Sequence, residues 1–293
     1  MEKALIYYGY PSCIDKKYDT DYAVKKFSEF DIVVFPGSKK GFKSIENTSH
    51  EDHEKSKYII KNLNNKKFGY IACGNRPGID SCWNDNEIKA IIDQWKIMGV
   101  NGIFLDEFGK DYKNTDLRQS EIINTVKHNN FNIIINLWNT AELLERPDLN
   151  INSDDYYLLE SFIFRNNGEI TQYQEKDNIF QKISDSVDLR NSTGIKIITY
   201  NTFGNDSDIV YDEFISTLDS LNNFISADAT GIAKRDYYIY DTEIIDYAPK
   251  DYDFAKNFRI KHFLSKYSRS DRKDIYVQWK KDKFGGKPTD IKI

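Results

Sequence analysis

Eight short apolar runs recur along the first 230 or so residues, and the segments between them have helical periodicity. Each run is rich in β-branched and aromatic residues and is almost continuously apolar, which is typical of parallel strands covered on both faces. The runs are ALIYYGY (4–10), DIVVFPG (31–37), FGYIACG (68–74), GIFLDEFG (102–109), FNIIINLW (131–138), YYLLESFIF (156–164), KIITYNTF (196–203) and FISADATG (224–231).

The segment NDNEIKAIIDQWKIMG (84–99) carries the clearest helix signals between these runs. Asn84 and Glu87 have the spacing of a capping box, and Gly99 is a typical helix stop. The apolar residues of one helical face are Ile88, Ile91, Ile92, Trp95 and Met98. Further helices are predicted at 21–30, 51–63, 117–129, 173–190 and 209–223.

A strand followed by a helix, repeated eight times over about 230 residues, predicts an α/β fold of the (β/α)8 TIM-barrel type. We expect this barrel to span 1–250 as one catalytic domain. The remaining residues, 251–293, are predicted to be a C-terminal helix (254–267) and a short basic extension, packed on the barrel or trailing from it.

Charge is distributed unevenly along the chain. The net charge is −5, but residues 256–293 carry +8, which leaves −13 on residues 1–255. An acidic body argues against nucleic acid as a partner. The basic extension predicts either packing on this body or attachment to an anionic surface such as a virion.

Other sequence signals limit the compartment and the cofactors. No run approaches the roughly 18 apolar residues of a transmembrane segment, and MEKALIYYGY lacks the features of a secretory signal. We therefore expect a cytoplasmic or phage-associated protein, or an extracellular one if a leader has been removed. Metal and nucleotide motifs such as H-E-x-x-H, G-x-G-x-x-G and the P-loop do not occur, so no metal and no cofactor is expected.

In (β/α)8 barrels the active site is built at the C-terminal ends of the strands. The ends of the predicted strands carry acids, amides and aromatic rings, which is the combination that a sugar site uses. The candidate catalytic residues are Asp106, Glu107 and Glu160. The candidate substrate-binding residues are Tyr7, Tyr8, Tyr10, Asn75, Asn136, Trp138, Tyr200, Asn201 and Asp228.

Glu160 is a single carboxylate within the apolar run YYLLESFIF. A buried glutamate is costly unless it is paired, hydrogen-bonded or protonated. One interpretation is a structural ion pair with Arg165 or Lys196. The other is that burial raises its pKa, so that it acts as a general acid while a better-solvated Asp106 stays ionised.

Asp106 and Glu107 are neighbours, and neighbouring side chains of a strand point to opposite faces. Both can face the mouth of the barrel only where the strand has ended or bulges, so the pattern favours Asp106 over Glu107. The tyrosines of the first run and Trp138 have a plainer alternative as core or rim packing.

The first run with its continuation, YYGYPS (7–12), the run GIFLDEFG, and a glutamate 53 positions after Glu107 resemble the spherulin-4-type glycoside hydrolases. Related families are the endo-α-1,4-polygalactosaminidase-type barrels. The resemblance implies a (β/α)8 enzyme that cuts galactosamine-containing polysaccharides. It also implies catalytic acids on strands four and six, here Asp106, Glu107 and Glu160.

The acidic body favours cationic, partly de-acetylated amino-sugar polymers over polyanions. The sequence therefore predicts a glycoside hydrolase, endo-acting on an amino-sugar polysaccharide, with the assignment of acid and nucleophile or base left open. One alternative is a non-catalytic carbohydrate-binding or virion module on the same scaffold. Another is a lyase or aldolase that uses Lys196 or Lys234 as a Schiff-base amine.

Overall fold

The computed structural model describes residues 1–15, 17–37, 44–75, 83–160, 179–203, 218–219, 222, 225–234 and 247. Eight parallel strands form a closed barrel in chain order, and β1 pairs with β8 to complete it. The strands are β1 (Glu2–Ile6), β2 (Ile32–Phe35), β3 (Lys66–Ala72), β4 (Gly102–Asp106), β5 (Asn132–Ile135), β6 (Tyr156–Glu160), β7 (Lys196–Phe203) and β8 (Ala229–Lys234). The predicted (β/α)8 barrel is confirmed.

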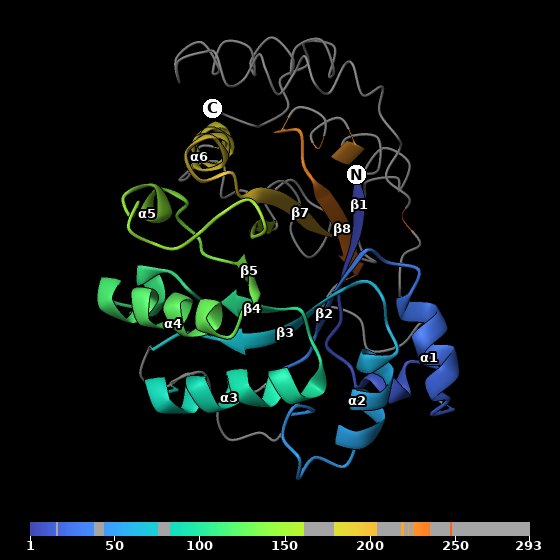
Figure 1. The fold of residues 1–293 in the computed structure, drawn as a ribbon. Coiled ribbons are helices and arrows are strands. Elements are labelled where there is room, and N and C mark those ends of the chain that lie inside the picture. The colour runs from blue at the N-terminus through green and yellow to red at the C-terminus, as the bar shows by residue number, and fades with distance from the viewer. Residues whose placement is uncertain are drawn as a thin grey trace.

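Helices lie around the outside of the strands (Figure 1). They are η1 (Pro11–Cys13), α1 (Thr20–Phe27), α2 (His53–Lys61), α3 (Asp85–Met98), η2 (Lys110–Tyr112), α4 (Asp116–His128), α5 (Ala141–Leu144) and α6 (Ile179–Thr193). Neighbouring helices contact one another in the pairs α1 with α2, α3 with α4, and α5 with α6. Among the described residues, no helix is long and apolar enough to cross a membrane.

The helix boundaries follow the capping signals of the sequence. Asn84 caps α3 in a complete capping box with Glu87, and Gly99 ends it with a φ of 87°. Asp19 caps α1 by accepting from the backbone N–H groups of Asp21 and Tyr22, and Thr115 caps α4 by accepting from that of Arg118. A capping side chain accepts hydrogen bonds from backbone N–H groups that have no partner within the helix, which fixes the point where the helix begins.

Packing between strands and helices depends on close approach at Gly69 of β3. A methyl group at this position would lie 2.1 Å from the ring of Trp95, which is fully buried on α3. The indole N–H of Trp95 also donates to the carbonyl oxygen of Tyr70, at 3.3 Å. Glycine at position 69 therefore lets the largest side chain of α3 lie directly on the sheet.

The N-terminal end of the barrel contains a polar cluster of residues at the starts of three strands. The Lys66 ammonium of β3 contacts Glu2 of β1 at 2.5 Å and donates to the hydroxyl of Tyr156 on β6 at 2.8 Å. Burial lowers the pKa of Lys66, but these partners outweigh it and the pKa is raised. The charges of Lys66 and Glu2 thus neutralise each other at this end of the barrel.

One predicted strand boundary is wrong, one short helix was not predicted, and several predicted segments lie outside the described residues. β8 begins at Ala229, five residues later than the run FISADATG suggested, and the short helix α5 was not predicted. The predicted helices 209–223 and 254–267, and the extension 251–293, fall wholly or almost wholly outside the described residues.

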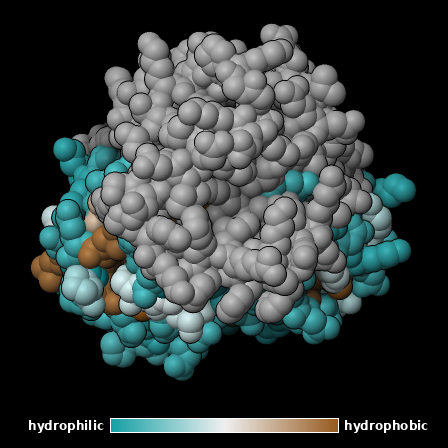
Figure 2. Space-filling view, turned by 90° about the horizontal axis from the view of Figure 1, so that it is seen from above, coloured by the Kyte–Doolittle hydropathy of each residue, from teal (hydrophilic) through white to brown (hydrophobic). Residues whose placement is uncertain are grey.

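The described part of the surface shows no broad apolar face in the view from above (Figure 2). Figure 2 shows that the described atoms there are mostly hydrophilic, with hydrophobic colour confined to small separate spots. A few exposed apolar side chains are normal for a folded protein and need no partner.

Candidate active site

Asp106 is the last residue of β4, and its carboxylate is held by three donors. The hydroxyl of Tyr70 donates to Oδ2 at 2.8 Å, the side-chain amide of Asn136 donates to Oδ1 at 2.8 Å, and the backbone N–H of Glu107 donates to Oδ1 at 2.9 Å. Burial raises the pKa of Asp106, whereas these hydrogen bonds favour its ionised form.

Glu160 ends β6, and its Oε2 accepts a hydrogen bond of 2.7 Å from the side-chain amide of Asn136. Burial is the main cause that raises the pKa of Glu160 to about 7, and the charge of Asp106 acts in the same direction. The bond from Asn136 and the charge of Lys182 oppose this shift. A carboxyl group with this pKa is a competent proton donor near neutral pH.

Asn136 therefore connects the two carboxyl groups through one nitrogen atom. Nδ2 carries two hydrogens, and one is directed to Asp106 while the other is directed to Glu160. The distance between the two accepting oxygens, Oδ1 of Asp106 and Oε2 of Glu160, therefore cannot exceed the combined length of the two hydrogen bonds. Asn136 was predicted to bind substrate at the end of β5. It lies at that position, but its side-chain amide contacts the two acids.

Glu107 follows the last residue of β4 and has a φ of 54°, which is rare outside glycine. The strand has thus ended before Glu107, which is the condition under which both acids can face the mouth. The charge of Glu107 raises the pKa of Asp106, Tyr70 and Cys73, so its carboxylate lies near these three groups.

The segment after Glu107 is fixed by hydrogen bonds to its backbone. Asn114 donates to the carbonyl of Glu107 at 2.7 Å, and Gln119 of α4 donates to the carbonyl of Phe108 at 3.0 Å. The backbone N–H of Lys110 donates to the buried Glu142 at 2.8 Å. Held at these points, the backbone at Glu107 can keep a conformation that would otherwise relax.

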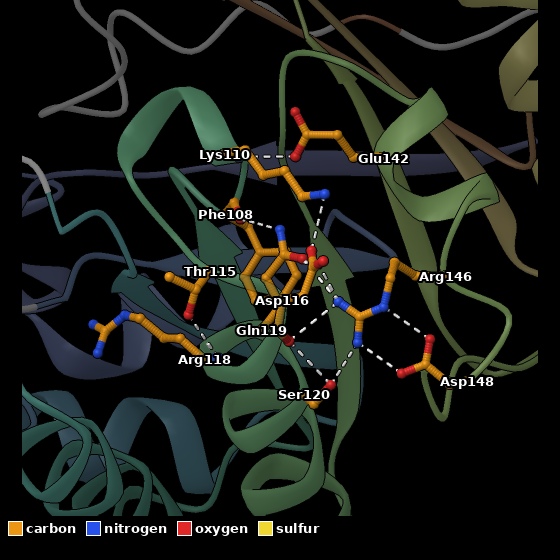
Figure 3. Close-up of polar contacts among 10 residues, drawn as sticks. All are labelled: Phe108, Lys110, Thr115, Asp116, Arg118, Gln119, Ser120, Glu142, Arg146 and Asp148. Atoms are coloured by element: carbon orange, nitrogen blue, oxygen red, sulfur yellow. Dashed lines mark hydrogen bonds and ion pairs between the residues drawn. The ribbon is translucent and has the colours of Figure 1, made fainter.

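Arg146 extends this support to α4 (Figure 3). Its guanidinium contacts the Asp116 carbonyl at 3.1 Å, Gln119 at 3.4 Å and Ser120 at 2.6 Å, and pairs with Asp148 at 2.7 Å. The loop after β4 is tied to α4 through Gln119 and to α5 through Glu142, and Arg146 in turn contacts Gln119. Rigid support of this kind is what precise placement of a reacting carboxylate requires.

Tyr8 lies among the acids. Its ring meets that of Tyr70 edge to face, with centroids 5.6 Å apart. Burial chiefly raises the pKa of Tyr8, and Tyr70, Asp106 and Glu160 raise it further, so the hydroxyl stays protonated and lies within range of both acids. A protonated hydroxyl can donate a hydrogen bond.

Tyr200 is in register with Glu160 and is fully buried. Its hydroxyl accepts a 3.1 Å hydrogen bond from the backbone N–H of Ile6, across β8. The Tyr200 side chain can cross β8 because residue 231 is glycine. A methyl group at this position would lie 2.3 Å from the Tyr200 ring and 2.3 Å from the carbonyl oxygen of Ala4. Tyr200 therefore braces β7 against β1.

Trp138 follows β5 and is half-buried. The ammonium of Lys182, on α6, lies 3.5 Å from the centroid of its ring, a close cation–π contact. Because the charge of Lys182 also lowers the pKa of Glu160, this lysine contributes to the electrostatics of the site.

Three predicted substrate-binding residues lie away from the acids. Tyr7 is fully buried and packs against Phe27 of α1, with ring centroids 5.1 Å apart. Asn201 is the buried neighbour of Tyr200 and, by strand alternation, belongs to the opposite face. Asp228 precedes β8 at the N-terminal end of the barrel, where it accepts from the backbone N–H of Ile197 and pairs with Arg190 at 3.4 Å.

The remaining predicted residues, Tyr10 and Asn75, are exposed beyond the ends of β1 and β3. Tyr70 and Lys182 were missed by the sequence interpretation. Tyr70 stands two residues before the end of β3, and only the length of its side chain brings its hydroxyl to Asp106. Lys182 lies on a helix, where no strand-end signal exists.

Fold and site together define a (β/α)8 barrel with two acids at the C-terminal ends of β4 and β6. Both acids accept a hydrogen bond from the same asparagine, Asn136. No family model matches the chain, and no curated protein matches it. The solved structures that it resembles in fold include the following two, each at 12% sequence identity.

One is the glycoside hydrolase domain of PelA from Pseudomonas aeruginosa, with a TM-score of 0.49 over 81% of this chain and 98% of that one. The other is the carboxyl transferase domain from Rhizobium etli pyruvate carboxylase with pyruvate, with a TM-score of 0.51 over 90% of this chain and 46% of that one. At these identities the likeness concerns the fold, and function is argued from the site.

Proposed function

We propose that this chain is a glycoside hydrolase that cleaves an amino-sugar polysaccharide, of the galactosamine type, with Asp106 and Glu160 as its catalytic pair. The observation that carries the proposal is the bridge of Asn136, which holds both carboxyl groups within 2.8 Å of one nitrogen while the pKa of Glu160 is about 7. Two carboxyl groups in different environments are the requirement for glycoside hydrolysis.

The environments suggest the role of each acid. Glu160, protonated near neutral pH, gives its proton to the glycosidic oxygen, and the bond from that oxygen to the anomeric carbon breaks. Asp106 accepts three hydrogen bonds and is the ionised partner. Asn136 can only donate through Nδ2, so the proton of Glu160 resides on Oε1 and the oxygen Oε2 stays an acceptor.

The spacing favours a retaining mechanism. In inverting enzymes the carboxyl groups are about 6.5 to 9.5 Å apart, which leaves room for a water molecule, and in retaining enzymes about 5 to 5.5 Å. Two oxygens that accept from the same nitrogen, at 2.8 and 2.7 Å, lie closer together than the inverting range requires. Asp106 would attack the anomeric carbon, and water would then release the sugar from Asp106 while Glu160 takes a proton from that water.

The choice of sugar rests on charge and on sequence. Residues 1–255 carry a net charge of −13, which attracts a cationic, partly de-acetylated amino-sugar chain. The likeness to the spherulin-4-type hydrolases in YYGYPS and GIFLDEFG supports the same class.

The test is release of reducing ends from galactosaminogalactan, chitosan, peptidoglycan and a neutral galactan. We expect cleavage of an amino-sugar polymer, lost in both Asp106→Asn and Glu160→Gln while circular dichroism shows an intact fold. Cleavage that survives both substitutions would reject the pair. Binding without cleavage of any polymer would instead support the non-catalytic carbohydrate-binding alternative.

A further inference from the structure

Exposed tyrosines gather in one part of the described surface. Its large hydrophobic side chains with substantial exposure are Tyr10 (44%), Tyr18 (57%), Tyr22 (38%), Tyr58 (48%), Ile97 (52%) and Leu117 (69%). Four of the six are tyrosines between residues 10 and 58, whereas the two aliphatic residues lie apart on α3 and α4.

Tyr22 lies on α1 and Tyr58 on α2, while Tyr10 directly precedes η1 and Tyr18 directly precedes the N-cap of α1. The elements η1, α1 and α2 contact one another. The hydroxyl of Tyr58 on α2 donates to Asp21 at 3.0 Å, which places it beside the first turn of α1, where Tyr22 lies. The ammonium of Lys55, one turn before Tyr58, lies 5.0 Å from the ring centroid of Tyr18. We call this set of four the tyrosine surface.

Several contacts fix these rings before any ligand binds. Tyr10 meets the ring of His50 edge to face, with centroids 4.8 Å apart. The loop that carries Tyr10 is tied to α2, because Asp52 accepts hydrogen bonds from both Ser12 and Ser56. Rings held in place lose little conformational freedom on binding.

Tyr18 adds an observation of a different kind. Its φ of 62° lies in the left-handed region, which bulky residues rarely adopt, although 57% of its side chain is exposed. Such backbone strain gathers at ligand-binding sites, where the surrounding structure holds it in place.

The tyrosine surface lies at the same end of the barrel as the active site. Tyr10 lies two residues beyond Tyr8, whose hydroxyl is within range of both acids. In a parallel barrel each helix begins near the C-terminal end of the strand before it, so the first turns of α1 and α2 lie at the same end as the active site.

The groups of the tyrosine surface suit a polar polymer. Tyrosine offers an apolar ring face together with a hydroxyl, and the neighbouring groups are Asp21 and Lys55 instead of leucine or isoleucine. We propose that the tyrosine surface binds a distal stretch of the same amino-sugar polysaccharide that enters the active site. This rests on the proposed function for the class of the polymer.

The test measures binding without cleavage. In the Asp106→Asn background, Tyr18, Tyr22 and Tyr58 are replaced together by alanine, and affinity for partly de-acetylated chitosan and for polygalactosamine is measured by affinity electrophoresis. We expect affinity to fall roughly tenfold or more, since each exposed ring contact contributes a fraction of the binding energy. The matched control replaces Ile97 and Leu117 with alanine in the same background and should bind as its parent does.

Unchanged polymer affinity in the triple variant, with an intact circular dichroism spectrum, would overturn the proposal, as would a parent that binds neither polymer. A parent that is dimeric in sedimentation, and a triple variant that is monomeric, would show that a second copy of the chain occupies the surface. The hydrolase proposal is judged separately, by reducing-end release from the unsubstituted chain. Loss of binding in the triple variant supports the tyrosine surface even if no polymer is cut.

Discussion

The side-chain amide of Asn136 donates to Glu160 at 2.7 Å, and through its other hydrogen it holds Asp106 at 2.8 Å. An asparagine that binds substrate would instead offer these hydrogens to a sugar hydroxyl. Asn136 is thus a positioning residue, which acts on the reaction through the two acids.

Asn136→Ala should lower kcat by about a hundredfold and change KM little, because it removes a donor that fixes both acids. It should also raise the pKa of Glu160, since the bond from Asn136 lowers it. Steady-state kinetics across pH test both effects. The contrast is Asn75→Ala at the exposed rim, for which a substrate contact predicts a higher KM; a rise in KM alone for Asn136→Ala would contradict the positioning role.

Lys182→Met should move the alkaline limit of activity to higher pH. A general acid works only while protonated, so kcat falls as pH rises through the pKa of Glu160, about 7. The charge of Lys182 lowers that pKa, and its removal raises it. Groups that face Glu160 include Asp106, Tyr8 and Asn136, and none of them is changed by this substitution.

The pKa of the Glu160 carboxyl can be measured directly by carbon-13 NMR titration of the parent protein and of Lys182→Met. Lys182→Arg keeps the charge and serves as the control. An alkaline limit that stays in place, or moves to lower pH, would show that Lys182 does not act on Glu160.

Glu160→Gln should stabilise the fold at high pH. Unfolded glutamate titrates near 4.5, whereas folded Glu160 keeps its proton to about 7. The folded state therefore binds more protons between these values, and the stability contributed at low pH is lost as pH rises through this window.

At pH 8 the free energy of unfolding of Glu160→Gln should exceed that of the parent by on the order of 1 to 3 kcal/mol, with a smaller difference at pH 4. Urea unfolding at the two pH values measures this. An equal difference at both would mean that the ionisation of Glu160 carries no folding penalty.

Gly231→Ala should destabilise the barrel by roughly 1 to 3 kcal/mol. Its methyl group would meet the backbone oxygen of Ala4 and the ring of Tyr200, each at 2.3 Å, and neither can move aside cheaply. At Gly109 the nearest atom is the end of the exposed Asp111 side chain, which can rotate, so Gly109→Ala is the matched control. Equal unfolding midpoints in urea for the two variants would contradict the close approach at β8.

The order of strands and the place of the acids were predictable because they depend on local pattern. Buried parallel strands produce continuous apolar runs, and the barrel puts the ends of those runs at one rim. Asp106, Glu160 and Asn136 were found in this way. The capping box of α3 likewise fixed a helix start from two residues.

What the sequence did not reveal depends on distance between segments. Nothing local shows that Asn136 bonds to the acids, or that Lys182 of α6 lies on Trp138. Asp228 was misplaced because only the end of the run FISADATG, from Ala229, belongs to β8, and an apolar run does not show at which residue a strand begins. Tyr7 and Tyr8 differ only by strand alternation, whose phase in an all-apolar run is invisible.

The most direct measurement is proton NMR of an amino-sugar polymer during its cleavage by the unsubstituted protein. The account predicts that the first reducing ends to form keep the anomeric configuration of the cleaved bond, and that Asp106→Asn forms none. Products with the opposite configuration would contradict the close carboxylate pair held by Asn136, and the absence of any new reducing end would contradict the hydrolase itself.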